Sequence, residues 1–154
     1  MTTGSTLVVF KQAVVAALAA RPGLAGVQIT YEYPIGSITG ADIWLADASA
    51  DTRIPVMRAG VLKVEEDYTL LIIAQVLKTQ GEGQEAADIA ALGLLREVQQ
   101  QFAEKPQLVP DIQWAEVRSW RHRVGPFGVD EVGGNANRGS RFEIDVGVRA
   151  RLGS

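Results

Sequence analysis

KVEEDYTLLIIAQVLK, residues 63–78, is the longest strand pattern in the chain. Its apolar residues recur at alternate positions, which is typical of a β-strand. Near the middle both faces are apolar, because Leu70 and Ile72 point to one side and Leu71 and Ile73 to the other. Such a strand is either central in its sheet and covered on both faces, or one of its faces meets a partner.

Four further segments have the same period. Residues 27–33 alternate apolar and polar side chains, which predicts a half-buried strand. Residues 41–46 predict a short strand, and Pro55 in the polar stretch that follows favours the edge of a sheet. Residues 112–124 and 141–152 are the last two strands, and the alternation is most regular in the second of them.

Two segments, residues 7–20 and 85–105, instead carry apolar residues at helical spacing. The predicted element order is therefore α-β-β-β-α-β-β. With both helices on one face of a mostly antiparallel sheet, this is a two-layer α+β fold. A length of 154 residues fits one domain spanning residues 1–154, and we find no repeat or linker that would divide it.

One segment departs from these periods. Residues 125–139 read GPFGVDEVGGNANRG, and five of them are glycine. The segment is too long for a simple hairpin turn and too polar to build a core. Because ordering it would cost backbone entropy, we expect a flexible loop that a neighbouring subunit holds in place.

Charge is unevenly placed along the chain. Residues 1–111 carry 8 Lys/Arg and 13 Asp/Glu, a balance of −5, and residues 112–154 carry 7 Arg and 5 Asp/Glu, a balance of +2. Parts of opposite sign can attract a second copy head to tail. An acidic chain is also a poor candidate for binding nucleic acid, which needs a basic face.

The composition excludes several classes of site and location. The chain has no cysteine, so disulfides and Cys-ligated metal sites are excluded. No apolar run approaches the roughly 20 residues that span a bilayer, and the N-terminal apolar segment lacks the features of a signal peptide. We therefore expect synthesis in the cytoplasm and no membrane partner.

One motif suggests nucleotide chemistry. Residues 81–86 match the G-x-G-x-x-A turn of dinucleotide-binding proteins. However, the preceding elements are consecutive strands, and Glu82 and Glu85 would repel a pyrophosphate. Glycines that ease a turn and acids that favour a helix N-terminus explain the segment better.

Other reactive side chains also lack the partners that chemistry needs. His122 is the only histidine, so it has no second imidazole for a metal site. Glu143 and Asp145 share a strand face with Arg149 and Arg151, which favours ion pairing with a neighbouring strand or subunit over acid–base work. We predict that the chain is not an enzyme and has no catalytic residue, cofactor or metal.

The run RSWRHR, residues 118–123, combines arginine with tryptophan. Such residues hold phosphates and stack on bases, but they are also enriched at protein interfaces. The acidic chain favours the interface, although DNA binding by Arg118, Arg121 and Arg123 remains an alternative. Our candidate residues for an interface with another subunit or with a partner protein are Trp44, Arg58, Trp120, Arg121, Arg123, Glu143, Asp145 and Arg149.

Four stretches together resemble a known family. They are LAARPGLAGVQITY (18–31), DYTL (67–70), FAEKPQL (102–108) and FEIDVGVRARL (142–152). In their order and spacing they resemble the small tail terminator proteins of long-tailed bacteriophages, especially those of actinobacterial phages and prophages. The resemblance covers nearly the whole chain.

The resemblance implies an α+β subunit of a ring, usually six-fold, at the head-proximal end of the virion tail. The ring caps the finished tail tube, stops its polymerisation and joins the tail to head-completion proteins, while DNA passes through its centre. The expected partners are other copies of the chain, the tail tube protein and a head-completion or stopper protein. The alternatives are a head–tail stopper or other neck subunit and, more distantly, a small ligand- or DNA-binding module.

A DNA conduit should not bind phosphate, so an acidic channel would suit this role. We therefore hypothesise that Glu65, Glu66 and Asp67 face or border the channel of the ring.

Overall fold

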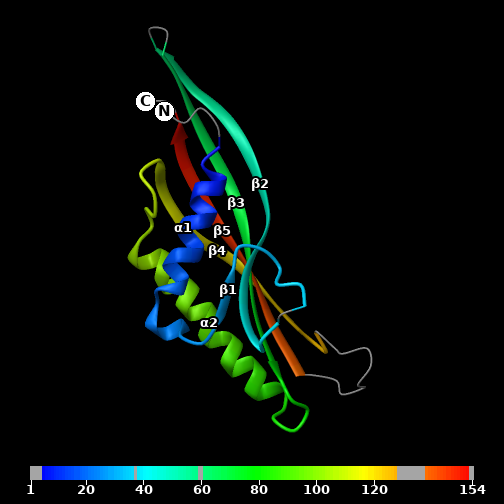
Figure 1. Cartoon of the computed structure of the whole chain (residues 1–154). Helices are drawn as coiled ribbons and strands as arrows, with labels where there is room; N and C mark the ends of the chain where they lie inside the picture. The colour runs from blue at the N-terminus through cyan, green and yellow to red at the C-terminus, as the bar shows by residue number, and fades with distance from the viewer. Residues whose placement is uncertain (1–4, 37, 59–60, 128–137, 153–154) are drawn as a thin grey trace.

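The computed structural model describes residues 5–36, 38–58, 61–127 and 138–152, and for residues 51–64 and 152 it describes the backbone alone. The elements in chain order are α1 (Leu7–Ala19), the 3-10 helix η1 (Pro22–Leu24), β1 (Gln28–Thr30), β2 (Ala41–Arg58), β3 (Val61–Lys78), α2 (Gln84–Glu104), β4 (Ile112–Gly125) and β5 (Arg138–Leu152). The predicted order and the α+β class are confirmed (Figure 1).

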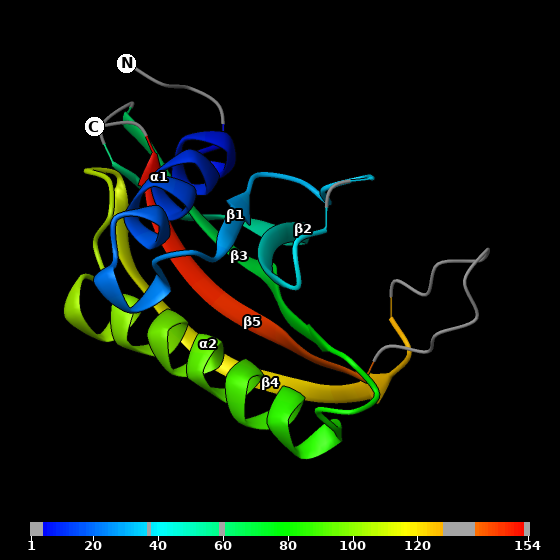
Figure 2. The same cartoon turned by 60° about the horizontal axis from the view of Figure 1, so that its bottom comes forward.

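All five strands form one sheet in the order β1-β2-β3-β5-β4. β1 and β2 are parallel, and the other three pairs are antiparallel. β3 is therefore central, one of the two alternatives that its two apolar faces left open, although the helices cover only one of those faces (Figure 2). It forms a long hairpin with β2 on one side and pairs with the whole of β5 on the other (Figure 1).

Both helices cover the same face of the sheet (Figure 2). Phe10 of α1 lies edge-on to Tyr68 of β3, with ring centroids 6.0 Å apart, and 6.2 Å from Phe102 of α2. The core thus lies where the two helices meet the middle of the sheet. Burying each large apolar side chain contributes about 1.5–3 kcal/mol, which makes this layer the main source of stability.

The helices follow from their apolar stripes. In α1 the buried residues Phe10, Val14 and Leu18 are four apart, so they lie on one side of the helix. α2 buries a broader stripe, which includes Ala91, Leu95 and Val98. Small alanines in that stripe let α2 lie close to the sheet.

The strands differ from the prediction at their ends. β1 is shorter than expected and stops at Thr30, so Tyr31 and Tyr33 lie beyond it. β2 is much longer than residues 41–46, because the polar stretch after them continues to pair with β3. Its register shifts between Arg53 and Val56, where Pro55 falls, since a proline without an N–H is tolerated at such an irregularity.

The prediction of a flexible Gly-rich loop at residues 125–139 lies mostly outside the described residues. The two ends of this segment belong to strands, since Gly125 of β4 pairs with Gly139 of β5. β5 thus starts at Arg138 rather than at residue 141. Within the described residues, no helix combines the length and the hydropathy needed to cross a membrane.

Candidate assembly surface on the open face and edges of the sheet

The face of the sheet opposite the helices carries charged side chains in cross-strand pairs. Between β5 and β3, Arg151 lies 2.8 Å from Glu65 and Arg149 lies 2.9 Å from Asp67. Between β4 and β5, Arg123 lies 3.0 Å from Glu143. The ion pairing expected with a neighbouring strand is therefore present within the subunit.

These ion pairs balance the charge of the open face but add little to the stability of the fold. Exposed ion pairs contribute only about 0–1 kcal/mol each. The hydrogen bonds from Arg149 to Asp67 raise the pKa of the Arg149 guanidinium, which stays charged. On β5 the remaining acid, Asp145, accepts a hydrogen bond from the Ser119 hydroxyl at 2.9 Å. The open face is thus a mosaic of both charges rather than an acidic sheet.

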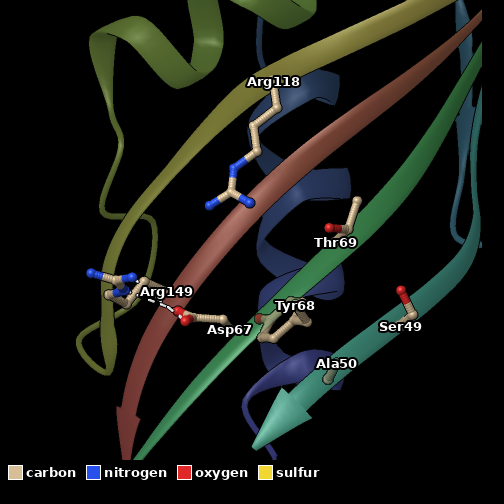
Figure 3. Close-up of a pocket in the computed structure, with 7 residues that line it drawn as sticks. All are labelled: Ser49, Ala50, Asp67, Tyr68, Thr69, Arg118 and Arg149. Atoms are coloured by element: carbon tan, nitrogen blue, oxygen red, sulfur yellow. Dashed lines mark hydrogen bonds and ion pairs between the residues drawn. The ribbon is translucent and has the colours of Figure 1, made fainter. Parts of the chain in front are cut away.

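A hollow of about 330 Å³ interrupts this face (Figure 3). Arg118 of β4 reaches across β5 at Gly147, where any Cβ would collide with the guanidinium. The Trp114 ring lies under both guanidinium groups, 5.3 Å from Arg118 and 5.5 Å from Arg149. The hollow is lined by Ser49, Ala50, Asp67, Tyr68, Thr69, Arg118 and Arg149.

Aromatic residues cover the open face near the end of β2 that pairs with β1. Tyr33 packs edge-on against Trp44 at 5.2 Å, and Arg141 stacks over Phe127 at 4.3 Å. Burial lowers the pKa of the Arg141 guanidinium, which the charge of Glu143 partly offsets. Trp44 is only 5% exposed, because its ring packs against residues of its own subunit. We therefore remove it from the candidate interface.

The three neighbouring acids of β3 do not form one surface. Glu65 and Asp67 lie on the open face, whereas Glu66 points to the helix side and is 5% exposed. Its carboxylate accepts hydrogen bonds from the Ser5 hydroxyl at 3.1 Å and from the Thr6 N–H at 3.2 Å. Glu66 therefore binds the start of α1. We no longer include it among the residues expected to line a channel.

β4 presents the most exposed candidates. The side chains of Arg121 and Arg123 are 68% and 50% exposed, and Trp120 is 51% exposed. Trp120 packs edge-on against Phe142 at 5.3 Å, which orients its ring on the helix side of this strand. Arg58 was also predicted to lie at an interface, but the structure describes only its backbone.

His122 has a structural position on β4. Its Nε2 lies 2.7 Å from the Ser140 hydroxyl and 3.3 Å from a carboxylate oxygen of Asp88 on α2. The imidazole also lies over the Phe142 ring, with centroids 4.7 Å apart. In the described part of the chain, no three His, Asp or Glu side chains are placed to share a metal ion.

The G-x-G-x-x-A segment is a turn between β3 and α2. Glu82 accepts hydrogen bonds from the backbone N–H and the hydroxyl of Thr79, each at 3.1 Å, and these bonds lower the pKa of its carboxyl. Gly83 precedes α2 with φ at 89°, a conformation that favours glycine. Both residues are explained by the turn itself.

The sheet has an open edge at each side. Among the described residues, β5 alone pairs with β4, and β1 pairs with β2 only at residues 42–44. The outer edge of β4 and that of β2 beyond Trp44 therefore carry backbone groups with no strand partner. Pro55 had indicated an edge in the stretch that continues β2, whereas sequence reasoning missed the edge of β4, because that edge depends on the strand order.

Known proteins similar to this chain are found by its fold and not by its sequence. No family model matches the chain, and no curated protein matches it in sequence. Among solved structures, it is similar to a chain in the virion of a native gene transfer agent particle, with a TM-score of 0.59 and 13% identity over 92% of this chain and 94% of that one. That match shows a shared fold.

A second structure has a weaker likeness. It belongs to the sheath/tube terminator of an extracellular contractile injection system in the extended state, with a TM-score of 0.46 and 17% identity over 100% of this chain and 59% of that one. At that TM-score the likeness adds nothing to the functional argument.

Proposed function

We propose that the chain is a virion structural protein, a tail terminator subunit whose ring caps the tail tube. In this role the ring ends tube polymerisation and joins the tail to head-completion proteins. The observation that carries the proposal is the fold shared, over nearly the full length of both chains, with a component of a gene transfer agent virion. It agrees with the family resemblance of the four sequence stretches.

The surfaces of the subunit support a structural role. A ring needs two different patches that complement each other, and the two open sheet edges are different patches of this kind. The exposed Trp120, Arg121 and Arg123 are of the types enriched in protein interfaces. No catalysis, cofactor or membrane enters this proposal.

The open face suits the channel of such a ring. We keep Glu65 and Asp67 as candidate channel residues, each paired with an arginine of β5. A face with balanced charges would neither bind DNA phosphates strongly nor repel them strongly. DNA would then pass without specific binding.

Co-expression with the tail tube protein of the same genome tests the proposal. Electron microscopy of negatively stained tubes should show a ring at one tube end and shorter tubes than those assembled without the chain. Bare ends and an unchanged length distribution would contradict it. Binding to purified connector or stopper rings, with no binding to tubes, would instead favour a head–tail stopper or another neck subunit.

A further inference from the structure

The two open edges of the sheet are suited to each other. On β4 the side chain of Gln107 covers only the start of the strand, where its amide donates to the Gln113 carbonyl at 2.8 Å. Beyond that point the edge displays Trp120 and Val124, which are 51% and 56% exposed. Monomeric proteins seldom leave so long an edge open beside exposed apolar side chains.

The edges also differ in charge. From Val27 to Ala50, along β1 and the start of β2, the chain has the exposed Glu32 and Asp47, the buried Asp42 and no lysine or arginine; beyond Ala50, β2 contains Asp51, Arg53 and Arg58. The β4 segment has three arginines and one acid, Glu116. The part of the β2 edge before Asp51 therefore carries acidic charge only and the β4 edge is mainly basic, which favours contact between these parts of the two edges in neighbouring copies.

Strand direction is compatible with such a contact. β2 and β3, β3 and β5, and β5 and β4 are all antiparallel. After three reversals β4 runs opposite to β2. A second copy that continues the sheet would therefore present its β2 antiparallel to β4, in the ladder that backbone hydrogen bonds favour.

We propose that copies of this chain join by pairing β4 of one copy, antiparallel, with the outer edge of β2 beyond Trp44 in the next. The proposal deepens the ring assembly proposed above and rests on it for the closed shape, because a head-to-tail contact of this kind closes only at the right rotation. It puts the helices of every copy on one side of a shared sheet.

Cysteine cross-linking tests the pairing cleanly, because the chain has no cysteine of its own. Ser49→Cys or Asp51→Cys on β2 is combined in turn with Ser119→Cys, Arg121→Cys or Arg123→Cys on β4. These β2 and β4 positions belong to the open face by register. Mild oxidation and non-reducing electrophoresis then report which pairs join two copies.

Antiparallel pairing has a distinct pattern in this test. When the β2 cysteine moves from residue 49 to residue 51, the β4 position that cross-links best should move toward the N-terminus of β4. Movement toward the C-terminus would mean parallel pairing and would overturn the inference. Gln12→Cys on the exposed side of α1 replaces the β2 cysteine in the matched control and should give no cross-link with any β4 position.

Charge reversal gives a second readout in the uncross-linked protein. The double variant Arg121→Glu/Arg123→Glu should weaken self-association about ten-fold or more in analytical ultracentrifugation, since like charges would then face each other. Adding Asp47→Arg should restore part of it. Arg96→Glu on the exposed side of α2 is the control and should have little effect, and circular dichroism checks that each variant folds.

The outcomes separate this inference from the proposed function. Rings that form without any cross-link between β2 and β4 would overturn the inference and leave tube capping intact. A protein that stays monomeric and uncross-linked at every concentration would overturn the inference too, while the tube assay still decides the function. Ordered cross-links with uncapped tubes would support the inference and refute the terminator role.

Discussion

Glu66 is a buried carboxylate whose role lies entirely within the subunit. It accepts hydrogen bonds from Ser5 and from both the N–H and the hydroxyl of Thr6, where α1 begins. A negative charge there also interacts favourably with the helix dipole. The carboxylate thus attaches the N-terminal end of α1 to the central strand of the sheet.

Replacing Glu66 should therefore destabilise the fold. We expect Glu66→Ala to lower the free energy of unfolding by about 1–3 kcal/mol, because it leaves buried donors unpaired. Glu66→Gln keeps an acceptor and should cost less. Urea denaturation measures both, with Glu65→Ala on the open face as the control. An equal effect of Glu65→Ala and Glu66→Ala would contradict the assigned role.

Tyr68 adds a pH dependence at the same place. Burial raises the pKa of its phenol from 10.0 to about 12, and its hydroxyl lies 3.0 Å from that of Thr6. Because the folded state holds this proton more tightly than the unfolded state, the stabilisation is complete below pH 10 and is lost as the pH rises toward about 12.

A variant isolates this effect from other alkaline titrations. Tyr68→Phe removes the ionisable group but keeps the ring that packs on Phe10. We expect the wild-type protein to lose more stability than Tyr68→Phe between pH 10 and about pH 12, the interval between the two Tyr68 pKa values. Urea unfolding at a series of pH values measures this difference. Parallel curves for the two proteins would show that Tyr68 does not titrate in this way.

At the scale of elements, Arg21 connects the end of α1 to α2. Its guanidinium lies 2.7 Å from Glu97 and 3.2 Å from Glu104, and it donates to the Gln101 side chain at 3.1 Å. These bonds raise the pKa of Arg21, and its side chain is only 13% exposed. A planar guanidinium offers five N–H donors in a fixed geometry spread over three nitrogens, whereas a lysine ammonium offers three on one nitrogen.

Loss of Arg21 should loosen the contact between the helices. We expect Arg21→Ala to lower the free energy of unfolding by about 1–3 kcal/mol, and Arg21→Lys to recover only part of that loss. Arg96→Ala, on the exposed side of α2, is the matched control. Hydrogen exchange should show faster opening of the last turn of α1 in Arg21→Ala, and unchanged exchange there would refute the connecting role.

At the scale of the whole molecule, Trp120 reports assembly. It is half exposed in the subunit, whereas Trp44 is buried, and it lies on the strand proposed to meet a second copy. We expect the fluorescence of Trp120, taken as the difference between wild type and Trp120→Phe, to become less accessible to acrylamide as the protein concentration rises. Quenching that does not change while rings form would place Trp120 outside the contact.

The pattern of the sequence was sufficient for much of the architecture. Apolar periods of two and of 3.6 residues report local burial, so they predicted both helices and the strands, and the two apolar faces of β3 made a central place one of two alternatives. Strand ends were less accurate, because the polar stretch after residue 46 continues β2 through pairing with β3. In that stretch only Pro55 indicated a place in the sheet, at its edge.

The candidate surface depended on tertiary structure. Glu65, Glu66 and Asp67 are alike in sequence, yet alternation along β3 sends Glu66 under α1 and leaves the other two beside arginines of β5. Trp44 was expected at an interface, but Tyr33 and Arg141 cover it. Sequence composition identifies residues able to form contacts and does not say which contact each one makes.

The sequence by itself therefore determined the elements, the fold class and the uneven charge, because each depends on neighbours along the chain. Only the tertiary structure decided the strand order, the open edge of β4 and the partner of each charged side chain. The physical reason is distance along the chain: Arg151 and Glu65 are 86 residues apart, and they meet only through the register between β3 and β5.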